Sequence, residues 1–121
     1  MASILIVDDE TDVIEVLQDR LESYGIKVFS AASGLGALCK LSQEKFDGIF
    51  LDLRMPGMDG LTTLGEIRKT DKTTPIIVIT AFSNKDAAIQ AHAKGANEYL
   101  MKPFEWPDLK KKIEKTFHIE L

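Results

Sequence analysis

Five short apolar runs alternate with amphipathic segments along the chain, and this alternation constrains the fold more than any other feature of the sequence. The runs cover residues 3–7, 26–31, 48–52, 75–80 and 97–101. The first, third and fourth are continuously apolar, which is typical of strands buried on both faces of a parallel sheet. Five strand–helix repeats predict an α/β fold, a (βα)5 doubly wound parallel sheet of five strands.

Apolar residues at helical spacing lie between the runs. The first stripe is Val13, Ile14, Leu17 and Leu21, and the last is Trp106, Leu109, Ile113 and Phe117. We expect the first helix to begin after Thr11 or Asp12 as N-cap and to end before Gly25. The next three helices are expected to begin at capping side chains, which are Ser33, Asp59 and Ser83.

The helix expected after Ser83 differs from the others because its apolar face is small. This face comprises Ala87, Ala88, Ala91 and Ala93, with Ile89 beside them. Small side chains bury little area, so we expect this helix to dock weakly and to be a candidate mobile element.

Length, charge and cysteine content narrow the class of protein. A chain of 121 residues suits one domain, so we expect residues 1–121 to form a single unit. A net charge of -4 disfavours direct nucleic-acid binding by this domain. The single cysteine, Cys39, excludes an intrachain disulfide and fits a reducing compartment. Since no apolar run reaches the roughly 18 residues of a membrane span, we expect no membrane segment and a cytoplasmic location.

Polar side chains follow four of the five apolar runs. Right-handed crossovers bring the carboxyl ends of all the strands to one edge of the sheet, where such folds bind ligands. The residues expected at this edge are Asp8, Asp9 and Glu10 after the first run, Asp52 and Thr80 at the ends of the third and fourth, and Lys102 after the fifth. The sequence therefore predicts that carboxylates, a hydroxyl and an ammonium converge there.

These groups together indicate phosphoryl-transfer chemistry. Clustered carboxylates repel one another unless a cation neutralises them, and a hard divalent ion, Mg²⁺ or Mn²⁺, does this with oxygen ligands. The ammonium of Lys102 is no metal ligand but suits an anion beside the metal. An aspartate in such a site can act as a nucleophile and form an acyl phosphate. His92 and His118 form no recognisable hydrolase arrangement and are expected at the surface.

Four segments of the chain closely resemble the receiver domain of two-component response regulators. They read ILIVDDE, IFLDLRMPGMDG, PIIVITAF and GANEYLMKPF, and they spread over residues 4 to 104. The resemblance implies a flavodoxin-like sheet with strand order 2-1-3-4-5. It also implies a phosphorylation-activated signalling switch that catalyses only its own phosphoryl transfer and slow dephosphorylation.

The resemblance assigns roles to the acidic residues and to one neighbour. Asp52 matches the phosphoacceptor and also a metal ligand. Asp9 matches the second carboxylate bound directly to the metal, whereas Asp8 acts mainly through water. The backbone carbonyl of Arg54 would complete the ligands that the protein supplies.

The remaining site residues match groups that bind or sense the phosphoryl group. The Thr80 hydroxyl, the Ala81 backbone N–H and the Lys102 ammonium are expected to contact it. The bond between Lys102 and Pro103 is expected to be cis. Tyr99 matches an aromatic switch residue that moves with Thr80 and biases the surface formed by the fourth helix, fifth strand and fifth helix.

Two positions that tune phosphoryl lifetime in this family are Arg54 and Phe82. Both side chains are bulky, and neither is a carboxylate or amide suited to orienting an attacking water molecule. The sequence therefore predicts that self-dephosphorylation is not fast.

The implied partners are a phosphoryl donor and an output. The donor would be a sensor histidine kinase or a phosphotransfer protein, and the output an attached domain or a separate protein. A phosphorylation-linked homodimer is a further possibility. The segments DLRMPGMDGL and GANEYLMKPF also resemble receivers attached to transcription-activating ATPase and DNA-binding domains. A stand-alone relay protein and the receiver of a longer regulator both remain open.

Two other functions fit parts of the sequence less well. A Mg²⁺-dependent phosphohydrolase with an aspartate nucleophile usually has the nucleophile after the first strand and a second aspartate two residues later, where this chain has Arg54 after Asp52. A flavin-binding protein of the flavodoxin type needs a Ser/Thr/Gly-rich loop after the first strand. The acidic tract at residues 8–10 would repel the flavin phosphate.

Overall fold

The computed structural model of the protein describes residues 2–55, 57–81 and 85–121. The described residues form five strands and five helices in strict alternation. The strands are Ser3–Val7 (β1), Lys27–Ala31 (β2), Gly48–Leu51 (β3), Ile76–Thr80 (β4) and Glu98–Met101 (β5). The helices are Thr11–Glu22 (α1), Gly34–Gln43 (α2), Gly60–Thr70 (α3), Lys85–Ala93 (α4) and Trp106–Phe117 (α5). Phe82 and Ser83, for which the sequence predicts a lifetime-tuning role and a helix cap, lie outside the described residues.

The strands form one parallel sheet in the order β2-β1-β3-β4-β5. In the register at the centre of the sheet, Leu5 lies opposite Phe29 on one side and Ile49 on the other. The predicted fold class and strand order are both confirmed. The carboxyl ends of all five strands therefore lie along one edge of the sheet.

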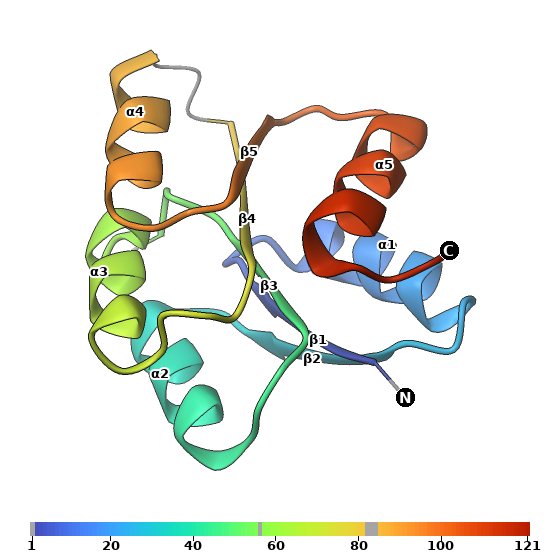
Figure 1. Cartoon of the computed structure of the whole chain (residues 1–121), viewed down its shortest axis with the longest axis horizontal. Coiled ribbons are helices and arrows are strands. Elements are labelled where there is room, and N and C mark those ends of the chain that lie inside the picture. Colours follow the sequence, from blue (N-terminus) through green and yellow to red (C-terminus); the bar gives the residue numbers. More distant parts are fainter. Residues whose placement is uncertain (1, 56, 82–84) are drawn as a thin grey trace.

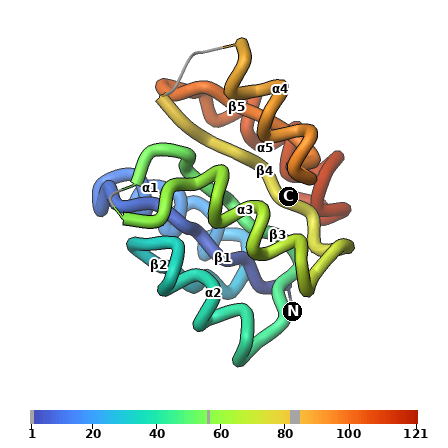
Figure 2. Tube along the Cα trace, turned by 90° about the vertical axis from the view of Figure 1, so that its left-hand side faces the viewer, coloured from blue at the N-terminus to red at the C-terminus, as the bar shows by residue number. Residues whose placement is uncertain are grey.

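Helices cover both faces of the sheet (Figure 1), with α1 and α5 on one face and α2, α3 and α4 on the other. Figure 2 looks onto the second layer and shows its three helices side by side over the strands. Successive strand residues point to opposite faces, so Ile4 and Ile6 pack under α1 and α5 while Leu5 and Val7 pack under α2 and α3. This two-sided burial explains the continuously apolar strands.

Two of the predicted helix caps are confirmed. The Ser33 hydroxyl accepts a hydrogen bond from the Gly36 N–H at 3.0 Å, and the Asp59 carboxylate accepts one from the Thr62 N–H at 2.7 Å. The bond from Thr62 is the largest cause of the lowered pKa of Asp59.

The predicted start of α1 is wrong by one or two residues. The helix already begins at Thr11, and its N-cap is Glu10 rather than Thr11 or Asp12. The physical reason is a turn made by Asp8, whose Oδ1 atom accepts a hydrogen bond from the Glu10 N–H at 2.9 Å. This bond holds Glu10 in an extended conformation and lets the helix start directly after it.

The predicted apolar face of α4 is only partly correct. Ala87 and Ala91 are buried, but Ala93 and Ile89 are exposed, the latter to 60%. Residues four apart share one face of a helix, whereas Ile89 lies about 200° around the axis from Ala87. The helix therefore docks through small side chains, and its largest apolar side chain faces outward.

On α5 the predicted stripe is buried through Leu109, Ile113 and Phe117. Trp106 is half-buried and stacks on Tyr24 at 6.1 Å between ring centroids. His92 and His118 are exposed, as predicted. Within the described ranges, no helix has the length and apolar character needed to cross a bilayer.

Candidate functional site

The backbone of the sheet extends one residue past several strands and so fixes the first side chains of the site. The Asp8 N–H donates to the Ala31 carbonyl at 3.0 Å, and the Asp52 N–H donates to the Val7 carbonyl at 2.9 Å. In the same way the Lys102 N–H donates to the carbonyl of the last residue of β4 at 2.8 Å. Three side chains far apart in sequence are thereby placed at the ends of β1, β3 and β5, along one edge of the sheet.

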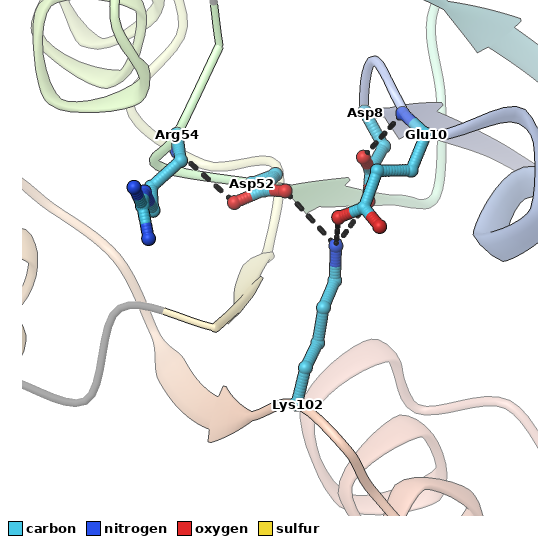
Figure 3. A network of polar contacts seen from close by, with 5 residues as sticks. All are labelled: Asp8, Glu10, Asp52, Arg54 and Lys102. Atoms are coloured by element: carbon cyan, nitrogen blue, oxygen red, sulfur yellow. Dashed lines mark hydrogen bonds and ion pairs between the residues drawn. The ribbon is translucent and has the colours of Figure 1, made fainter.

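The ammonium of Lys102 lies where three carboxylates meet, as Figure 3 shows. Its Nζ atom is 2.8 Å from Asp8 Oδ2, 2.9 Å from Glu10 Oε1 and 2.9 Å from Asp52 Oδ2. A lysine ammonium has three donors, and these three contacts use all of them. The predicted convergence of carboxylates and ammonium is therefore present, and it centres on Lys102.

Burial differs sharply among these four groups. The Asp8 and Asp52 side chains are only 4% and 3% exposed, and that of Lys102 is 10% exposed. The Glu10 side chain is 56% exposed and forms the open side of the cluster. Buried charges of this kind are tolerated because they are paired and hydrogen-bonded to one another.

The site shifts the pKa of two of its members. Burial raises the pKa of Asp8, and repulsion by Asp52 adds to it, although the hydrogen bonds from Lys102 and from the Glu10 N–H partly oppose the change. Burial alone would lower the pKa of Lys102, but its bonds to the three carboxylates outweigh that cost and raise the pKa above its ordinary value. Lys102 is therefore firmly charged at neutral pH.

The donor set of the cluster fits a hard divalent cation. One oxygen from each of Asp8, Glu10 and Asp52 lies within 4.8 Å of the others. Three carboxylates against one ammonium leave negative charge to be neutralised, and oxygen ligands suit Mg²⁺ or Mn²⁺. Asp9 is exposed and is not part of this set. Its direct coordination of a metal stays a prediction.

Glu10 is the member of the cluster to which the sequence assigned no role. It was expected at this edge of the sheet, but only Asp8 and Asp9 of the acidic tract were predicted to act in the site. A signal was nevertheless present: residues two apart in an extended segment point to the same side, so the side chain after Asp9 returns to the side of Asp8. Glu10 has this extended conformation, with φ -90° and ψ 105°.

The second oxygen of Asp52 is held by the backbone that follows it. The Arg54 N–H donates to Asp52 Oδ1 at 3.0 Å. In Figure 3 the guanidinium of Arg54 points away from the carboxylates. The side chain at this position is exposed. Coordination of a metal by the Arg54 carbonyl stays a prediction.

The start of α3 presses against the backbone of Asp52. The Gly60 N–H donates to the Leu53 carbonyl at 3.0 Å. A Cβ atom at Gly60 would overlap the Asp52 carbonyl oxygen and the Leu53 Cα atom, so a side chain there would push the phosphoacceptor candidate out of place.

Thr80, Ala81 and Tyr99 lie on the neighbouring strands. Thr80 ends β4 and is fully buried, and the exposed Ala81 follows it. Tyr99 lies opposite Val78 in the register of β4 and β5, is half-buried, and packs against the core under α2, α3 and α4. Burial and the charge of Asp52 raise the pKa of Tyr99. The roles of these residues stay predictions, while the cis bond between Lys102 and Pro103 is confirmed.

Comparison with known families identifies this arrangement. A family model described as the response regulator receiver domain matches residues 4–114 of the chain. The chain belongs to this family. It is a receiver domain of a two-component response regulator, a signalling switch, and its acidic cluster is compatible with a phosphorylation site and Mg²⁺.

The receiver domain is also similar to parts of curated transcription regulators. It is 39% identical over 113 residues to the transcriptional regulatory protein ZraR of Salmonella typhimurium, covering 93% of this chain and 26% of ZraR. It is 40% identical over 100 residues to the DNA-binding transcriptional regulator NtrC of Klebsiella pneumoniae, covering 83% of this chain and 21% of NtrC. The chain thus spans about a quarter of the length of these relatives.

Solved structures share the fold of the receiver domain. Response regulator protein TrrA from Thermotoga maritima, solved in complex with Mg(2+)-BeF, superposes with a TM-score of 0.86 at 39% identity, covering 95% of this chain and 98% of TrrA. A CheY-like receiver domain protein from Methanospirillum hungatei gives a TM-score of 0.93 at 30% identity, covering 98% and 94% of the two chains.

Proposed function

We propose that Asp52 of this receiver domain accepts a phosphoryl group from a phosphorylated histidine of a sensor kinase or a phosphotransfer protein. The observation that carries the proposal is the setting of its carboxylate. Asp52 is buried at the end of β3, with Oδ2 2.9 Å from the Lys102 ammonium and Oδ1 3.0 Å from the Arg54 N–H. A strand and two donors hold the nucleophile in one orientation, which is what a transfer reaction needs.

The transfer is a substitution at phosphorus. An oxygen of Asp52 forms a bond to phosphorus as the phosphorus–nitrogen bond to the donor histidine breaks. The electron pair of the broken bond goes to the imidazole, which takes up a proton from water. Lys102, the Thr80 hydroxyl and the Ala81 N–H then hold the phosphoryl oxygens through charge-assisted hydrogen bonds.

We propose that Asp52, Asp9 and the Arg54 carbonyl hold Mg²⁺ or Mn²⁺, with Asp8 acting through water. When bound, such a cation neutralises charge on the carboxylates and on the transferring phosphoryl group. The oxygen-rich cluster of Asp8, Glu10 and Asp52 supports a cation beside Asp52, as does the similarity to TrrA, which was solved with Mg(2+)-BeF. The direct roles of Asp9 and the Arg54 carbonyl rest on the resemblance to the receiver family.

Phosphorylation is proposed to act through Thr80 and Tyr99. Thr80 moves toward the phosphoryl group, and Tyr99 moves into the space it leaves. This change would bias the surface formed by α4, β5 and α5, where Ile89 and Met101 expose apolar side chains to 60% and 49%. We propose this surface as the contact for an output domain or protein and for a phosphorylation-linked homodimer.

The lifetime of the phosphoryl group is proposed to be long because Arg54 and Phe82 supply no group that activates water. We also propose that the domain catalyses only its own phosphorylation and dephosphorylation and acts on no separate substrate. Its similarity to ZraR and NtrC supports a place in a cytoplasmic transcription regulator, with residues 1–121 as the receiver and nucleic-acid binding left to another domain.

Labelling with acetyl phosphate in the presence of Mg²⁺ tests the proposal. Wild-type protein should gain one phosphoryl group, detected by intact mass, and Asp52→Asn should gain none. Equal labelling of both proteins would contradict the assignment of Asp52. Catalytic turnover of a small phosphoester would instead support the phosphohydrolase alternative.

A further inference from the structure

Glu10 contacts Lys102, but it has no role in the phosphoryl transfer proposed above. Its Oε1 atom lies 2.9 Å from Lys102 Nζ, and its side chain is 56% exposed. The other two partners of Lys102 have competing duties in the proposed reaction: Asp52 carries the phosphoryl group, and Asp8 turns to the cation.

Lys102 therefore needs a partner that survives phosphorylation. All three of its donors are used by Asp8, Glu10 and Asp52. Once the cation engages the oxygens of Asp52 and Asp8, and until the phosphoryl oxygens are in place, Asp52 and Asp8 would do little to orient the long side chain of Lys102. A free lysine side chain has considerable rotamer entropy, and ordering it at the moment of reaction is costly.

We infer that Glu10 is a positioning residue that holds the ammonium of Lys102 over Asp52 from the solvent side throughout the reaction. This inference rests on the proposed function, because Lys102 binds the phosphoryl group there. Glu10 touches neither the phosphoryl group nor the attacking oxygen, and it acts through Lys102.

The backbone around Glu10 supports such a role. Its N–H donates to Asp8 Oδ1 at 2.9 Å, and its carbonyl accepts the N–H of Ile14 at 3.2 Å in the first turn of α1. The residue is thus fixed on both sides, between a buried carboxylate and a helix. A carboxylate on such a rigid base can locate a partner, whereas one on a free loop cannot.

Three substitutions distinguish the possible roles of the contact between Glu10 and Lys102. Glu10→Ala removes both the charge and the acceptor oxygen. Glu10→Gln keeps an acceptor oxygen at the same reach but removes the charge. Asp12→Asn removes one negative charge from the exposed first turn of α1 and serves as the matched control.

The first readout needs neither metal nor phosphoryl donor. In ¹⁵N-lysine-labelled protein, the buried and triply bonded ammonium of Lys102 should give a slowly exchanging signal, assigned by its loss in Lys102→Arg. Glu10→Ala should abolish or markedly broaden this signal. Glu10→Gln should shift it and retain it, and Asp12→Asn should leave it unchanged.

The second readout is the rate of labelling by acetyl phosphate at saturating Mg²⁺. We expect Glu10→Ala to lower the rate about threefold to tenfold, the range for losing a half-exposed charge-assisted hydrogen bond. Glu10→Gln should recover at least half of the loss, and Asp12→Asn should match wild type. The Mg²⁺ affinity, followed by backbone amide shifts, should change less than about threefold in all three variants.

Three results would overturn the inference. An unchanged Lys102 signal and an unchanged labelling rate in Glu10→Ala would show that Glu10 is only a solvated charge. Equal effects of Glu10→Ala and Glu10→Gln would show that Glu10 acts through its charge alone. A tenfold loss of Mg²⁺ affinity in both variants would show that Glu10 is a metal ligand. If wild-type protein takes no label while the Lys102 signals behave as expected, the proposed function fails and the positioning contact stands.

Discussion

The Oδ2 atom of Asp52 lies 2.9 Å from the Nζ atom of Lys102, although the two residues are 50 positions apart in the chain. Strands β3 and β5 are separated by β4 in the sheet, so only the long side chain of Lys102 can bridge them. This link joins the nucleophile candidate to the strand that carries Tyr99. It also makes one ammonium responsible for balancing three carboxylates.

Replacing Lys102 should therefore destabilise the domain as well as impair phosphorylation. In Lys102→Ala, three carboxylates remain close together without their cation, and the free energy of unfolding at pH 7 should fall by about 2–4 kcal/mol. Urea unfolding measures this loss. It should shrink at pH 5, because protonation of a carboxylate relieves the repulsion.

The matched control for this change is Lys112→Ala. Lys112 forms a half-exposed ion pair with Glu98 at 3.1 Å, which should contribute about 0–1 kcal/mol. In the wild type the Lys102 contribution should be complete between pH 7 and pH 10.5 and be lost as the pH rises through the raised pKa. Equal losses in the free energy of unfolding of Lys102→Ala and Lys112→Ala would contradict the stabilising role of Lys102 among the three carboxylates.

Removing the charge of Asp8 should stabilise the metal-free domain. Burial and repulsion by Asp52 raise the pKa of Asp8 above 3.8, so the folded state binds this proton more tightly than the unfolded chain does. The destabilising effect of its charge is thus present at neutral pH and disappears as the pH falls through the raised pKa.

Asp8→Asn should therefore raise the free energy of unfolding at pH 7 by about 1 kcal/mol, with the gain vanishing toward pH 4. Thermal or urea unfolding across this pH range gives the comparison. A variant less stable than wild type at pH 7 would show that the ion pair of Asp8 with Lys102 outweighs its burial cost.

A side chain at Gly60 should damage the site through the backbone. In Gly60→Ala the new Cβ atom collides with the backbone of Asp52 and Leu53, neither of which can rotate away. We expect a loss of about 1–3 kcal/mol in the free energy of unfolding. Labelling of Asp52 by acetyl phosphate should slow as well.

The control lies on the same helix. A Cβ atom at Gly65 meets only the end of the Lys94 side chain, at 3.7 Å. Gly65→Ala should therefore stabilise α3 by up to about 1 kcal/mol through helix propensity. If both alanine substitutions have the same effect, the close contact at Gly60 has no energetic consequence.

Arg68 on α3 should anchor the loop that leads from α4 to β5. Its guanidinium donates to the Gly95 carbonyl at 2.9 and 3.0 Å, to Asn97 Oδ1 at 3.1 Å and to the Asp71 carbonyl at 3.1 Å. Lysine cannot reproduce this planar set of donors, so Arg68→Lys should cost about 1–2 kcal/mol.

Hydrogen exchange localises the effect of Arg68→Lys. Amides of residues 94–97 should exchange faster in the variant, while those of β1 keep their protection relative to global stability. Exchange that increases evenly over the whole domain would mean that Arg68 supports overall stability without acting on this loop.

The strands and the topology were predictable because the sheet is buried on both faces. Every predicted strand contains the observed one, with at most one extra residue at an end. The cap at Asp59 was predictable for a similar reason, since one short side chain and one N–H decide it. Local and regular patterns of this kind leave few alternatives.

The parts that could not be predicted depend on contacts across the chain or on weak patterns. The start of α1 is set by a bond from the Glu10 N–H to Asp8, which competes with the capping residues that follow. Only two alanines, Ala87 and Ala91, are buried on α4, and such small side chains leave a weak sequence pattern from which to predict the buried face of the helix. The place of Glu10 in the site depends on Lys102, 92 residues later.

The central claim is that Asp52 becomes an acyl phosphate in a Mg²⁺-dependent reaction. Peptide mass spectrometry after acetyl phosphate treatment and borohydride reduction tests it most directly, because reduction marks the carboxyl group that carried the phosphoryl group. We predict the mark on Asp52 alone, dependent on Mg²⁺. A mark on Asp8, Asp9 or Glu10, or none on Asp52 with Mg²⁺ present, would contradict the account.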